Sequence, residues 1–272
     1  MNDVITSAQN PRVKDAAALR DRRERERRQR ILVEGAREIE RALRSGWVVD
    51  SAFVCHELMS DGARAVLPKL TRISAVSAHV FDKLAVRDGS DGLAVIFQTK
   101  TTALADALVG AAPLVIALHG IEKPGNLGAI LRTADGIGAT GVVCLEGTSD
   151  ALSPNAIRAS LGTVFALPVA VATTDDLLTA GRARGLTFYA AALGEAARPP
   201  WQHDLRKPTC LVLGAEATGL PEAWLAAADA RVLIPMRGIA DSLNVAAAGA
   251  MLLYEALRQR VSEGRPETAS SG

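Results

Sequence analysis

The sequence predicts an α/β protein with two domains, each built from strands that alternate with helices. Two observations support this class. Short apolar runs alternate with segments of helical periodicity along most of the chain. In the second half the apolar runs are almost unbroken, which is typical of buried parallel strands. A chain of 272 residues, 49% of them hydrophobic, is long enough to bury two cores of this kind.

The first half begins with an irregular lead-in and a basic helix that starts at Pro11. In the segment 12–30, carboxylates precede arginines by four residues, the spacing of ion pairs along a helix. The expected pairs are Asp21 with Arg25, Glu24 with Arg28, and Glu26 with Arg30. Arginine remains in excess after this pairing. Two interpretations stay open: a solvated, self-paired helix, or a contact with the backbone of a nucleic acid.

Strands and helices then alternate up to residue 98. The predicted strands are 31–33, 47–54, 71–76 and 93–98. The predicted helices are 34–44, 57–67 and 78–86. This pattern predicts a small α/β domain over residues 1–100, followed by a weakly patterned linker at residues 101–112.

The second half repeats the alternation over a predicted domain of residues 113–261. The predicted strands are 114–118, 141–145, 165–171, 186–191, 209–213 and 231–234. The predicted helices are 127–137, 151–160, 175–184, 221–228 and a long final one that ends near residue 260. Residues 262–272 are rich in Glu, Ser, Gly and Pro, and we expect them to form a disordered tail.

Charge and cysteine content restrict the class of protein. The formal net charge is only +1, so nucleic-acid affinity would have to come from local clusters of charge. Cys55, Cys144 and Cys210 are far apart in apolar surroundings, which favours buried thiols over disulfides. The N-terminus has no apolar signal segment, and no apolar run is long enough to span a bilayer. We therefore expect a cytoplasmic protein without a membrane anchor.

Three polar, glycine-containing loops follow strong strands, at residues 122–128, 214–219 and 234–245. Ligands of open α/β sheets bind at the carboxyl ends of the strands, so these loops are candidate binding loops. The third leads into the final helix through Asp241 or Ser242, both good N-cap residues. Ser242 and Asn244 would then lie near a helix N-terminus, where polar or anionic groups bind.

The final helix has an apolar stripe at steps of three and four residues. Its members are Leu243, Ala247, Ala250, Tyr254, Leu257 and Val261. Residues 246–250 are Ala or Gly, so we expect another part of the chain to approach the helix backbone closely there.

A second glycine pattern at residues 136–141 matches G-x-G-x-x-G. In a dinucleotide-binding loop this pattern follows a strand and opens a helix, whose N-terminus holds the pyrophosphate. Here it follows a predicted helix and precedes a strand. A nicotinamide oxidoreductase is therefore a poor fit.

The three loops together resemble the motifs of the SpoU (TrmH-type) RNA ribose 2'-O-methyltransferases of the SPOUT superfamily. The matching residues are Asn126-x-Gly128-x-x-x-Arg132, Leu213-Gly-x-Glu216-x-x-Gly219-Leu220, and Ile234-Pro-Met236 with Ser242-Leu-Asn244-Val245. The first half resembles the small RNA substrate-binding domain that often precedes this domain. Its matching residues are Ser7-x-x-Asn10-Pro11 and Val33-Glu34-Gly35.

The resemblance implies a parallel-sheet catalytic domain with a C-terminal trefoil knot, preceded by a small α/β substrate-binding domain. It further implies a homodimer that binds S-adenosyl-L-methionine and methylates a ribose 2'-hydroxyl of structured RNA, ribosomal RNA being favoured over transfer RNA. The alternative is a non-catalytic RNA-binding protein with the same fold.

The resemblance also implies site residues. Arg132 would lie at the 2'-hydroxyl, as its base or, since a guanidinium stays protonated, as an orienting cation. The other implied catalytic residues are Asn126, Glu216, Ser242 and Asn244. The implied cofactor-binding residues are Leu213, Gly214, Glu216, Gly219, Ile234, Met236, Ser242, Leu243 and Asn244. No metal is expected, because the four histidines lack metal-ligand spacing.

Taken singly, these residues also have purely structural interpretations. Arg132 may be read as an ion-pair partner of Glu216, Asn126 as a turn residue, and Ser242 as a helix cap. Met236 fits ordinary core packing. His119, just before the first loop, fits either a proton acceptor or a packed side chain bonded to the backbone.

Overall fold

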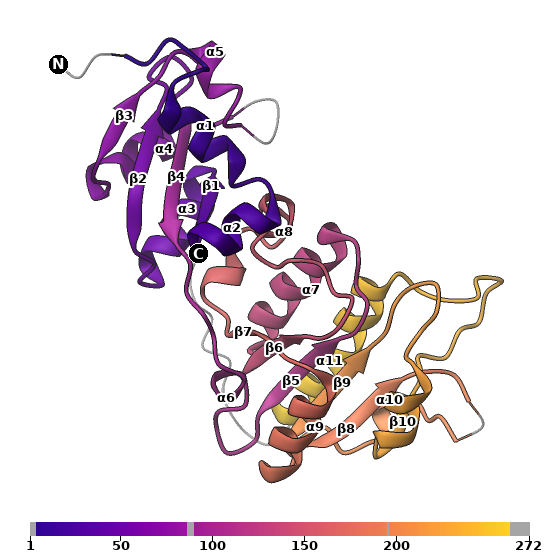
Figure 1. The fold of residues 1–272 in the computed structure, drawn as a ribbon. Helices are drawn as coiled ribbons and strands as arrows, with labels where there is room; N and C mark the ends of the chain where they lie inside the picture. Colours follow the sequence, from indigo (N-terminus) through magenta and orange to yellow (C-terminus); the bar gives the residue numbers. More distant parts are fainter. Residues whose placement is uncertain (1–3, 86–89, 195, 262–272) are drawn as a thin grey trace. The chain divides into compact units, whose positions relative to one another are not determined.

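Figure 1 shows the computed structural model of the chain, which describes residues 4–85, 90–194 and 196–261. The chain forms two compact units. The first comprises Met1–Thr101, Pro124–Arg132 and Asp150–Leu167, and the second Thr102–Lys123, Thr133–Ser149 and Pro168–Gly272. The predicted disordered tail at 262–272 and residue 86 of a predicted helix lie outside the described residues.

The first unit contains a four-stranded mixed sheet in the order β1-β4-β2-β3. The strands are β1 (Arg30–Glu34), β2 (Val49–Val54), β3 (Ile73–Ala75) and β4 (Leu93–Gln98). β4 is antiparallel to both of its neighbours. The helices of this unit are α1 (Pro11–Ala18), α2 (Arg22–Arg28), α3 (Ala36–Arg44), α4 (Asp61–Val66) and α5 (Ala78–Phe81), with a 3-10 turn η1 (Leu67–Lys69). The predicted small α/β layer is confirmed, with shorter helices than expected.

The basic segment is two helices and not one. Asn10 caps α1, and Asp21 caps α2 by accepting hydrogen bonds from the backbone N–H groups of the second helix. The predicted Glu24–Arg28 pair is present at 2.7 Å. The other two predicted pairs are wrong, because both arginines take tertiary partners: Arg25 pairs with Asp150 and Arg30 with Asp50. Glu26 instead pairs with Arg22, four residues earlier on α2.

A segment from the second half of the sequence packs in the first unit. It contains α8 (Pro154–Ala159) and the 3-10 turn η2 (Thr163–Phe165). The Phe165 ring contacts the Trp47 ring edge to face, with centroids 5.0 Å apart, and the Trp47 indole N–H donates to the Phe165 carbonyl. The predicted strand 165–171 is therefore too long. Only Val169–Val171 (β7) pairs with the sheet, because the apolar residues before it serve the other core.

The second unit is built on a six-stranded sheet in the order β10-β8-β9-β5-β6-β7, and every pairing is parallel. The strands are β5 (Leu114–Leu118), β6 (Gly141–Cys144), β7, β8 (Thr187–Ala191), β9 (Thr209–Leu213) and β10 (Ala230–Val232). The central strands β5, β6 and β9 are buried throughout, as the continuous apolar runs predicted, whereas the edge strands β7 and β10 are only partly buried.

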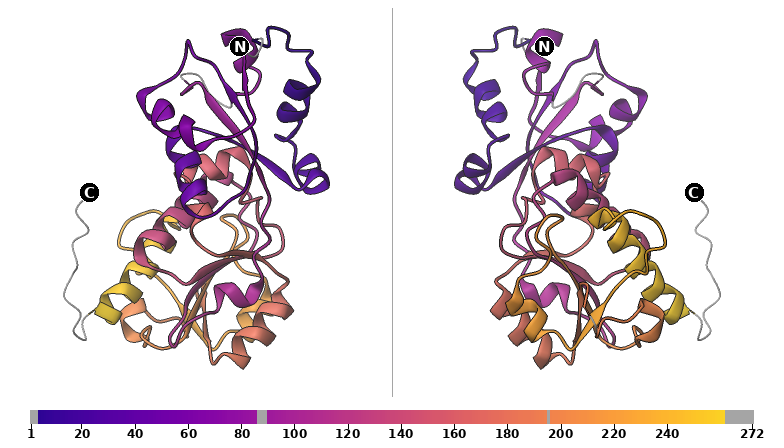
Figure 2. Two further views of the ribbon diagram at one scale, coloured as in Figure 1. Left: turned by 90° about the vertical axis from the view of Figure 1, so that its left-hand side faces the viewer. Right: turned by 90° about the vertical axis from the view of Figure 1, so that its right-hand side faces the viewer.

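Helices cover both faces of this sheet (Figure 2). Side chains alternate between the faces along each strand, so Val115 and Ala117 of β5 share a core with Phe188 and Trp224. This face is covered by α6 (Leu104–Ala107), α9 (Thr174–Ala183) and α10 (Glu222–Ala227), and the opposite face by α11 (Val245–Val261). The predicted linker thus contains α6, whose Ala107 is fully buried.

The apolar stripe of α11 is not the face that the helix buries. The helix buries Val245, Gly249, Leu252, Leu253 and Ala256, whereas Tyr254 and Val261 are exposed. The stripe drawn from the sequence is offset from the packed one, because alanines on every side of the helix leave its inner face ambiguous. The buried Gly249 agrees with the expected close approach to the helix backbone.

The glycine run at 136–141 terminates a helix. α7 (Pro124–Ile137) ends at Gly138, which has a left-handed backbone (φ +76°), and β6 begins at Gly141. The inverted context predicted for this run is confirmed, and it offers no helix N-terminus to a pyrophosphate. Within the described residues, no helix is long and apolar enough to cross a membrane.

Candidate functional site

Two of the candidate loops leave adjacent strands at the same edge of the sheet. Leu118 at the end of β5 is opposite Leu213 at the end of β9. The His119 N–H donates to the Leu213 carbonyl over 2.9 Å, which extends the pairing into the loops. The parallel arrangement therefore brings the segment after β5 and the segment after β9 together, as the sequence predicted.

Main-chain contacts shape the loop after β9. Ala215 and Gly219 exchange two backbone hydrogen bonds of 3.1 and 2.9 Å, which close the loop on itself. A Cβ atom on Gly214 would lie 2.3 Å from the Gly219 carbonyl carbon and 2.5 Å from the Leu220 nitrogen. Gly219 has a left-handed backbone (φ +67°). Glycine is therefore required at both positions, one for space and one for conformation.

Glu216 connects three segments at this edge. One carboxylate oxygen accepts a hydrogen bond of 2.6 Å from Lys123, the residue of the first loop that directly precedes α7. The other accepts a hydrogen bond of 2.8 Å from the Asn244 side-chain amide, at the start of α11. The bond to Glu216 raises the pKa of Lys123. Lys123 was missed as a site residue, since a lone lysine before Pro124 carries no recognisable signal.

Asn244 is the N-cap of α11. Its side-chain oxygen accepts hydrogen bonds from the backbone N–H groups of Ala246 and Ala247, at 3.0 and 3.4 Å. The predicted cap at Asp241 or Ser242 is therefore wrong, because the helix starts at Val245. One amide thus performs two tasks: its oxygen caps the helix, and its nitrogen holds Glu216.

The remaining predicted cofactor-binding residues lie along these loops. Leu213 is buried at the strand end, and Ile234 and Leu243 are half-buried. Ser242 is exposed, and so is Met236, at 39%. The core-packing interpretation of Met236 does not hold. The stretch between β10 and α11 has no regular structure, and most of its side chains are exposed.

Asn126 and Arg132 lie on α7, in the segment that belongs to the first compact unit. The Arg132 side chain is exposed and makes no hydrogen bond or ion pair with a described residue. The structural interpretation of Arg132, an ion pair that ties two loops, therefore finds no support. That Asn126 and Arg132 converge with Glu216 and Asn244 stays a prediction.

His119 is three-quarters buried beside the first loop. Its Nε2 lies 3.9 Å from a carboxylate oxygen of Glu146. Burial raises the pKa of Glu146, but hydrogen bonds from Thr174 outweigh it and leave that pKa below its usual value. The part of the chain that the structure describes has no group of three or more His, Cys, Asp or Glu residues that would hold a metal ion.

Comparison with known proteins identifies the fold and the loops. Residues 113–254 match the model of the SpoU rRNA Methylase family, and residues 10–95 match the MRM3-like substrate binding domain. The chain belongs to the SpoU rRNA methylase family. The predicted family, the parallel-sheet SPOUT fold and the substrate-binding domain ahead of it are confirmed.

Relatives resemble the chain over most of its length. The 23S rRNA (guanosine(2553)-2'-O)-methyltransferase RlmP of Bacillus subtilis is 31% identical over 92% of this chain and 97% of its own. The 23S rRNA (uridine(2479)-2'-O)-methyltransferase of Streptomyces viridochromogenes is 32% identical over 88% of this chain and 76% of its own.

Solved structures agree. A crystal structure of an RNA 2'-O ribose methyltransferase has a TM-score of 0.84 and 41% identity, and covers 95% of this chain and 99% of its own. The SpoU methyltransferase AviRb from Streptomyces viridochromogenes, in complex with AdoMet, has a TM-score of 0.84 and 30% identity over 94% of this chain and all of its own. As a SpoU family member the protein is an RNA 2'-O-methyltransferase that uses S-adenosyl-L-methionine, as the sequence predicted.

Proposed function

We propose that this SpoU enzyme methylates a ribose 2'-hydroxyl of 23S ribosomal RNA. The relatives named above that align with nearly the whole chain act on 23S rRNA by name, which favours this substrate over transfer RNA. The 23S rRNA enzymes named above align with about nine tenths of the chain, including the substrate-binding half. The tRNA (guanosine(18)-2'-O)-methyltransferase of Thermus thermophilus is 40% identical but aligns with only 56% of the chain and 77% of its own length. In our proposal the first domain, which these long alignments include, selects the RNA.

The loops fit S-adenosyl-L-methionine. Gly214 lets the backbone of Gly219 and Leu220 pack against it, and the left-handed Gly219 closes the second loop, so this loop exposes few side chains of its own. Met236 and Ser242 are exposed on the third loop, which the Asn244–Glu216 hydrogen bond joins to the second. In our proposal these loops bind the cofactor, together with Leu213, Glu216, Ile234, Leu243 and Asn244. The cofactor supplies a methyl group already activated on a sulfonium, so the chain needs only to position the two reactants.

The contact of Glu216 with Lys123 and Asn244 is the observation that carries this proposal. It holds the first loop, the second loop and the N-terminus of α11 in one arrangement. Arg132 has no described partner and stays available to the RNA. In the proposal Arg132 orients the ribose or its phosphate, since a guanidinium does not give up its proton at neutral pH. Asn126 and Ser242 complete the contacts around the 2'-hydroxyl.

An Arg132→Ala variant tests the assignment. We expect methyl transfer from tritiated S-adenosylmethionine to unmodified 23S rRNA to fall by about 100-fold, because a positioning contact in the transition state is lost. Cofactor affinity by calorimetry stays unchanged. Arg64, another exposed arginine on a helix, supplies the control variant Arg64→Ala, which keeps full transfer. Full transfer by Arg132→Ala would show that the site is assigned wrongly.

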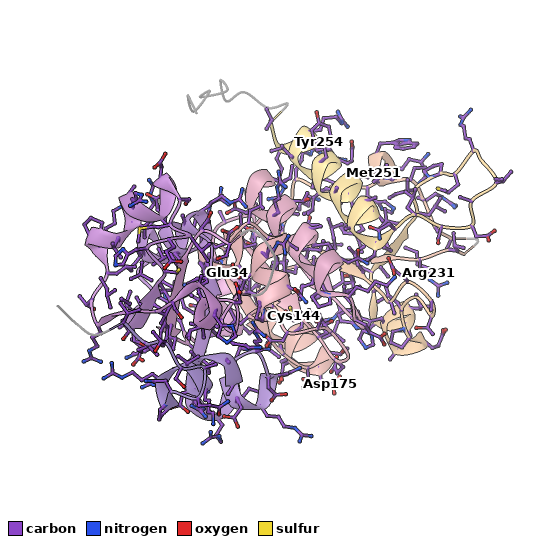
Figure 3. The ribbon with its side chains drawn as sticks, turned by 90° about the horizontal axis from the view of Figure 1, so that it is seen from above. Glu34, Cys144, Asp175, Arg231, Met251 and Tyr254 are labelled. Atoms are coloured by element: carbon purple, nitrogen blue, oxygen red, sulfur yellow. The ribbon has the colours of Figure 1, made fainter. Side chains whose placement is uncertain are left out.

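We also propose a homodimer that meets through α11, a trefoil knot in the second unit, and a cytoplasmic location. Met251 and Tyr254 are 49% and 61% exposed on α11 (Figure 3), and the exposed Trp201 lies on the 3-10 turn η3 (Pro200–Gln202), which contacts this helix. Such an apolar surface favours association. The dimer would be refuted if light scattering gave the mass of a single chain for the protein and for every variant measured. The buried free thiols of Cys55, Cys144 and Cys210 support a reducing compartment.

A further inference from the structure

A cavity of about 570 Å³ lies within the first unit, and none of the three methyl-transfer loops lines it. Its walls come from the end of β1, the N-terminus of α3, the stretch before β4, and α8. Glu34, labelled in Figure 3, is one of the lining residues. The volume falls in the range of small-molecule sites and exceeds that of a nucleoside.

The wall contains a buried carboxylate that is only half satisfied. Glu38 is 6% exposed. Its Oε1 accepts hydrogen bonds from Arg37 at 2.8 and 3.2 Å, whereas its Oε2 accepts none from the described residues. This oxygen is not a fully buried atom, so a ligand that supplies an N–H group can reach it from the cavity and donate to it.

Gly35 lets this carboxylate pack against the backbone at the end of β1. A Cβ atom at this position would lie 2.4 Å from Glu38 Oε2 and 3.9 Å from Asp91 Oδ2. The left-handed backbone of Gly35 (φ +101°) also disfavours any other residue. Asp91 is fixed by a hydrogen bond of 2.9 Å from the Ala36 N–H. Glu38 and Asp91 both line the cavity, so its wall carries two carboxylates that can act as hydrogen-bond acceptors.

The rim of the cavity has the opposite charge. Arg158 and Asn155 on α8 are exposed lining residues, and the Arg158 side chain makes no hydrogen bond or ion pair with a described residue. Arg37 already neutralises Glu38, which favours a neutral N–H donor over a bare cation in the cavity. An acceptor floor beneath a guanidinium rim matches a nucleotide, whose base carries N–H groups and whose phosphate carries negative charge.

We propose that this cavity binds one unpaired guanosine of the RNA substrate, away from the methylated ribose. The inference rests on the proposed function, because it assumes an RNA substrate. Guanine presents two adjacent donors, N1–H and N2–H, to the carboxylates. Adenine and cytosine place a ring-nitrogen acceptor beside their amino group, and uracil has a single donor, so each fits two carboxylates less well. Arg158 holds the phosphate at the rim.

Short single-stranded RNAs test the proposal on the full-length protein. Fluorescence anisotropy compares the hexanucleotides UUUGUU, UUUIUU (with inosine) and UUUUUU. We expect the guanosine RNA to bind at least about 10-fold more tightly than the other two, the discrimination of a good two-point base contact. In Glu38→Gln the guanosine preference disappears. In Arg158→Ala all three RNAs bind more weakly and the preference is kept, because a phosphate contact carries no base information.

The control is Glu40→Gln, on the same helix but outside the cavity wall, which keeps the preference. Equal binding of the three RNAs by the unaltered protein, or an unchanged preference in Glu38→Gln that retains its melting temperature, would overturn the inference. Because Arg158 is exposed, Arg158→Ala should fold, and it tests the rim of the cavity if Glu38→Gln does not fold. Cofactor affinity and methyl transfer, measured in parallel, report on the proposed function separately: their absence in the unaltered protein would reject the enzyme assignment and not the cavity.

Discussion

The loop site of the second unit and the cavity of the first unit use the same components in different surroundings. Each has a glycine just after a strand and a carboxylate held by a cation. The side chains of Glu216 and Lys123 are 32% and 73% exposed, whereas the side chain of Glu38 is 8% exposed. An exposed pair contributes little energy by itself and serves mainly to order loops. The Glu38 side chain is held in a cavity wall by Arg37, and its second oxygen remains available to a ligand, which is why we propose a base contact there and not at the exposed pair.

The backbone of the loop site gives the largest expected effect. Gly214→Ala places a Cβ atom within 2.5 Å of the backbone of Gly219 and Leu220. We expect a loss of about 3 kcal/mol in the free energy of unfolding and no cofactor binding, because backbone atoms must move apart. Thermal unfolding and calorimetry with S-adenosylmethionine measure both. In the control Gly136→Ala the Cβ meets nothing within 4 Å, and the helix gains stability. Normal cofactor affinity in Gly214→Ala would mean that backbone packing does not form this site.

Buried charge in the first unit gives the next effect. Arg25 is 5% exposed, pairs with Asp150 at 2.5 Å, and donates to the carbonyls of Leu19 and Arg20. Arg25→Ala removes the donor to Asp150 Oδ2 and to these two carbonyls, and we expect a loss of about 3 kcal/mol in stability. Urea unfolding of Arg27→Ala, whose side chain is 64% exposed on the same helix, should show under about 1 kcal/mol. Similar losses for both variants would remove the distinction between buried and exposed pairs.

The exposed pair of the loop site gives the smallest effect. Lys123→Ala should leave the melting temperature unchanged and weaken cofactor binding only several-fold, and high salt should abolish the difference by screening the pair. The control Lys207→Ala, whose lysine is equally exposed in its pair with Asp204, should leave cofactor binding intact. An unfolded Lys123→Ala variant would mean that the contact is structural.

The candidate loops could be predicted from the sequence because each is local. Unbroken apolar runs locate the strands, and the glycines and polar residues after Leu118, Leu213 and Ile234 mark their ends. Three features escaped the same reasoning. The partner of Arg25 is 125 residues away, Phe165 packs against Trp47 in the other half of the chain, and the buried face of α11 is hidden in a run of alanines.

The cavity escaped prediction for a related reason. Gly35 and Glu38 come from the start of α3, and Asp91 comes from the stretch before β4. Arg158 comes from α8, more than a hundred residues after Glu38. No spacing in the sequence joins them. They meet only because residues 150–167 fold with the first unit, which contact across the chain decides and periodicity does not.

The sequence by itself determined the order of strands and helices, the family, and which loops follow the strands of the parallel sheet, since these depend on apolar periodicity and on glycine at particular turns. Only the tertiary structure decided that Asn244 caps α11 while it holds Glu216, that Arg25 is buried against Asp150, and that Glu38 faces an open cavity. Burial sets the energy of a charged side chain, and burial depends on segments that are distant along the chain.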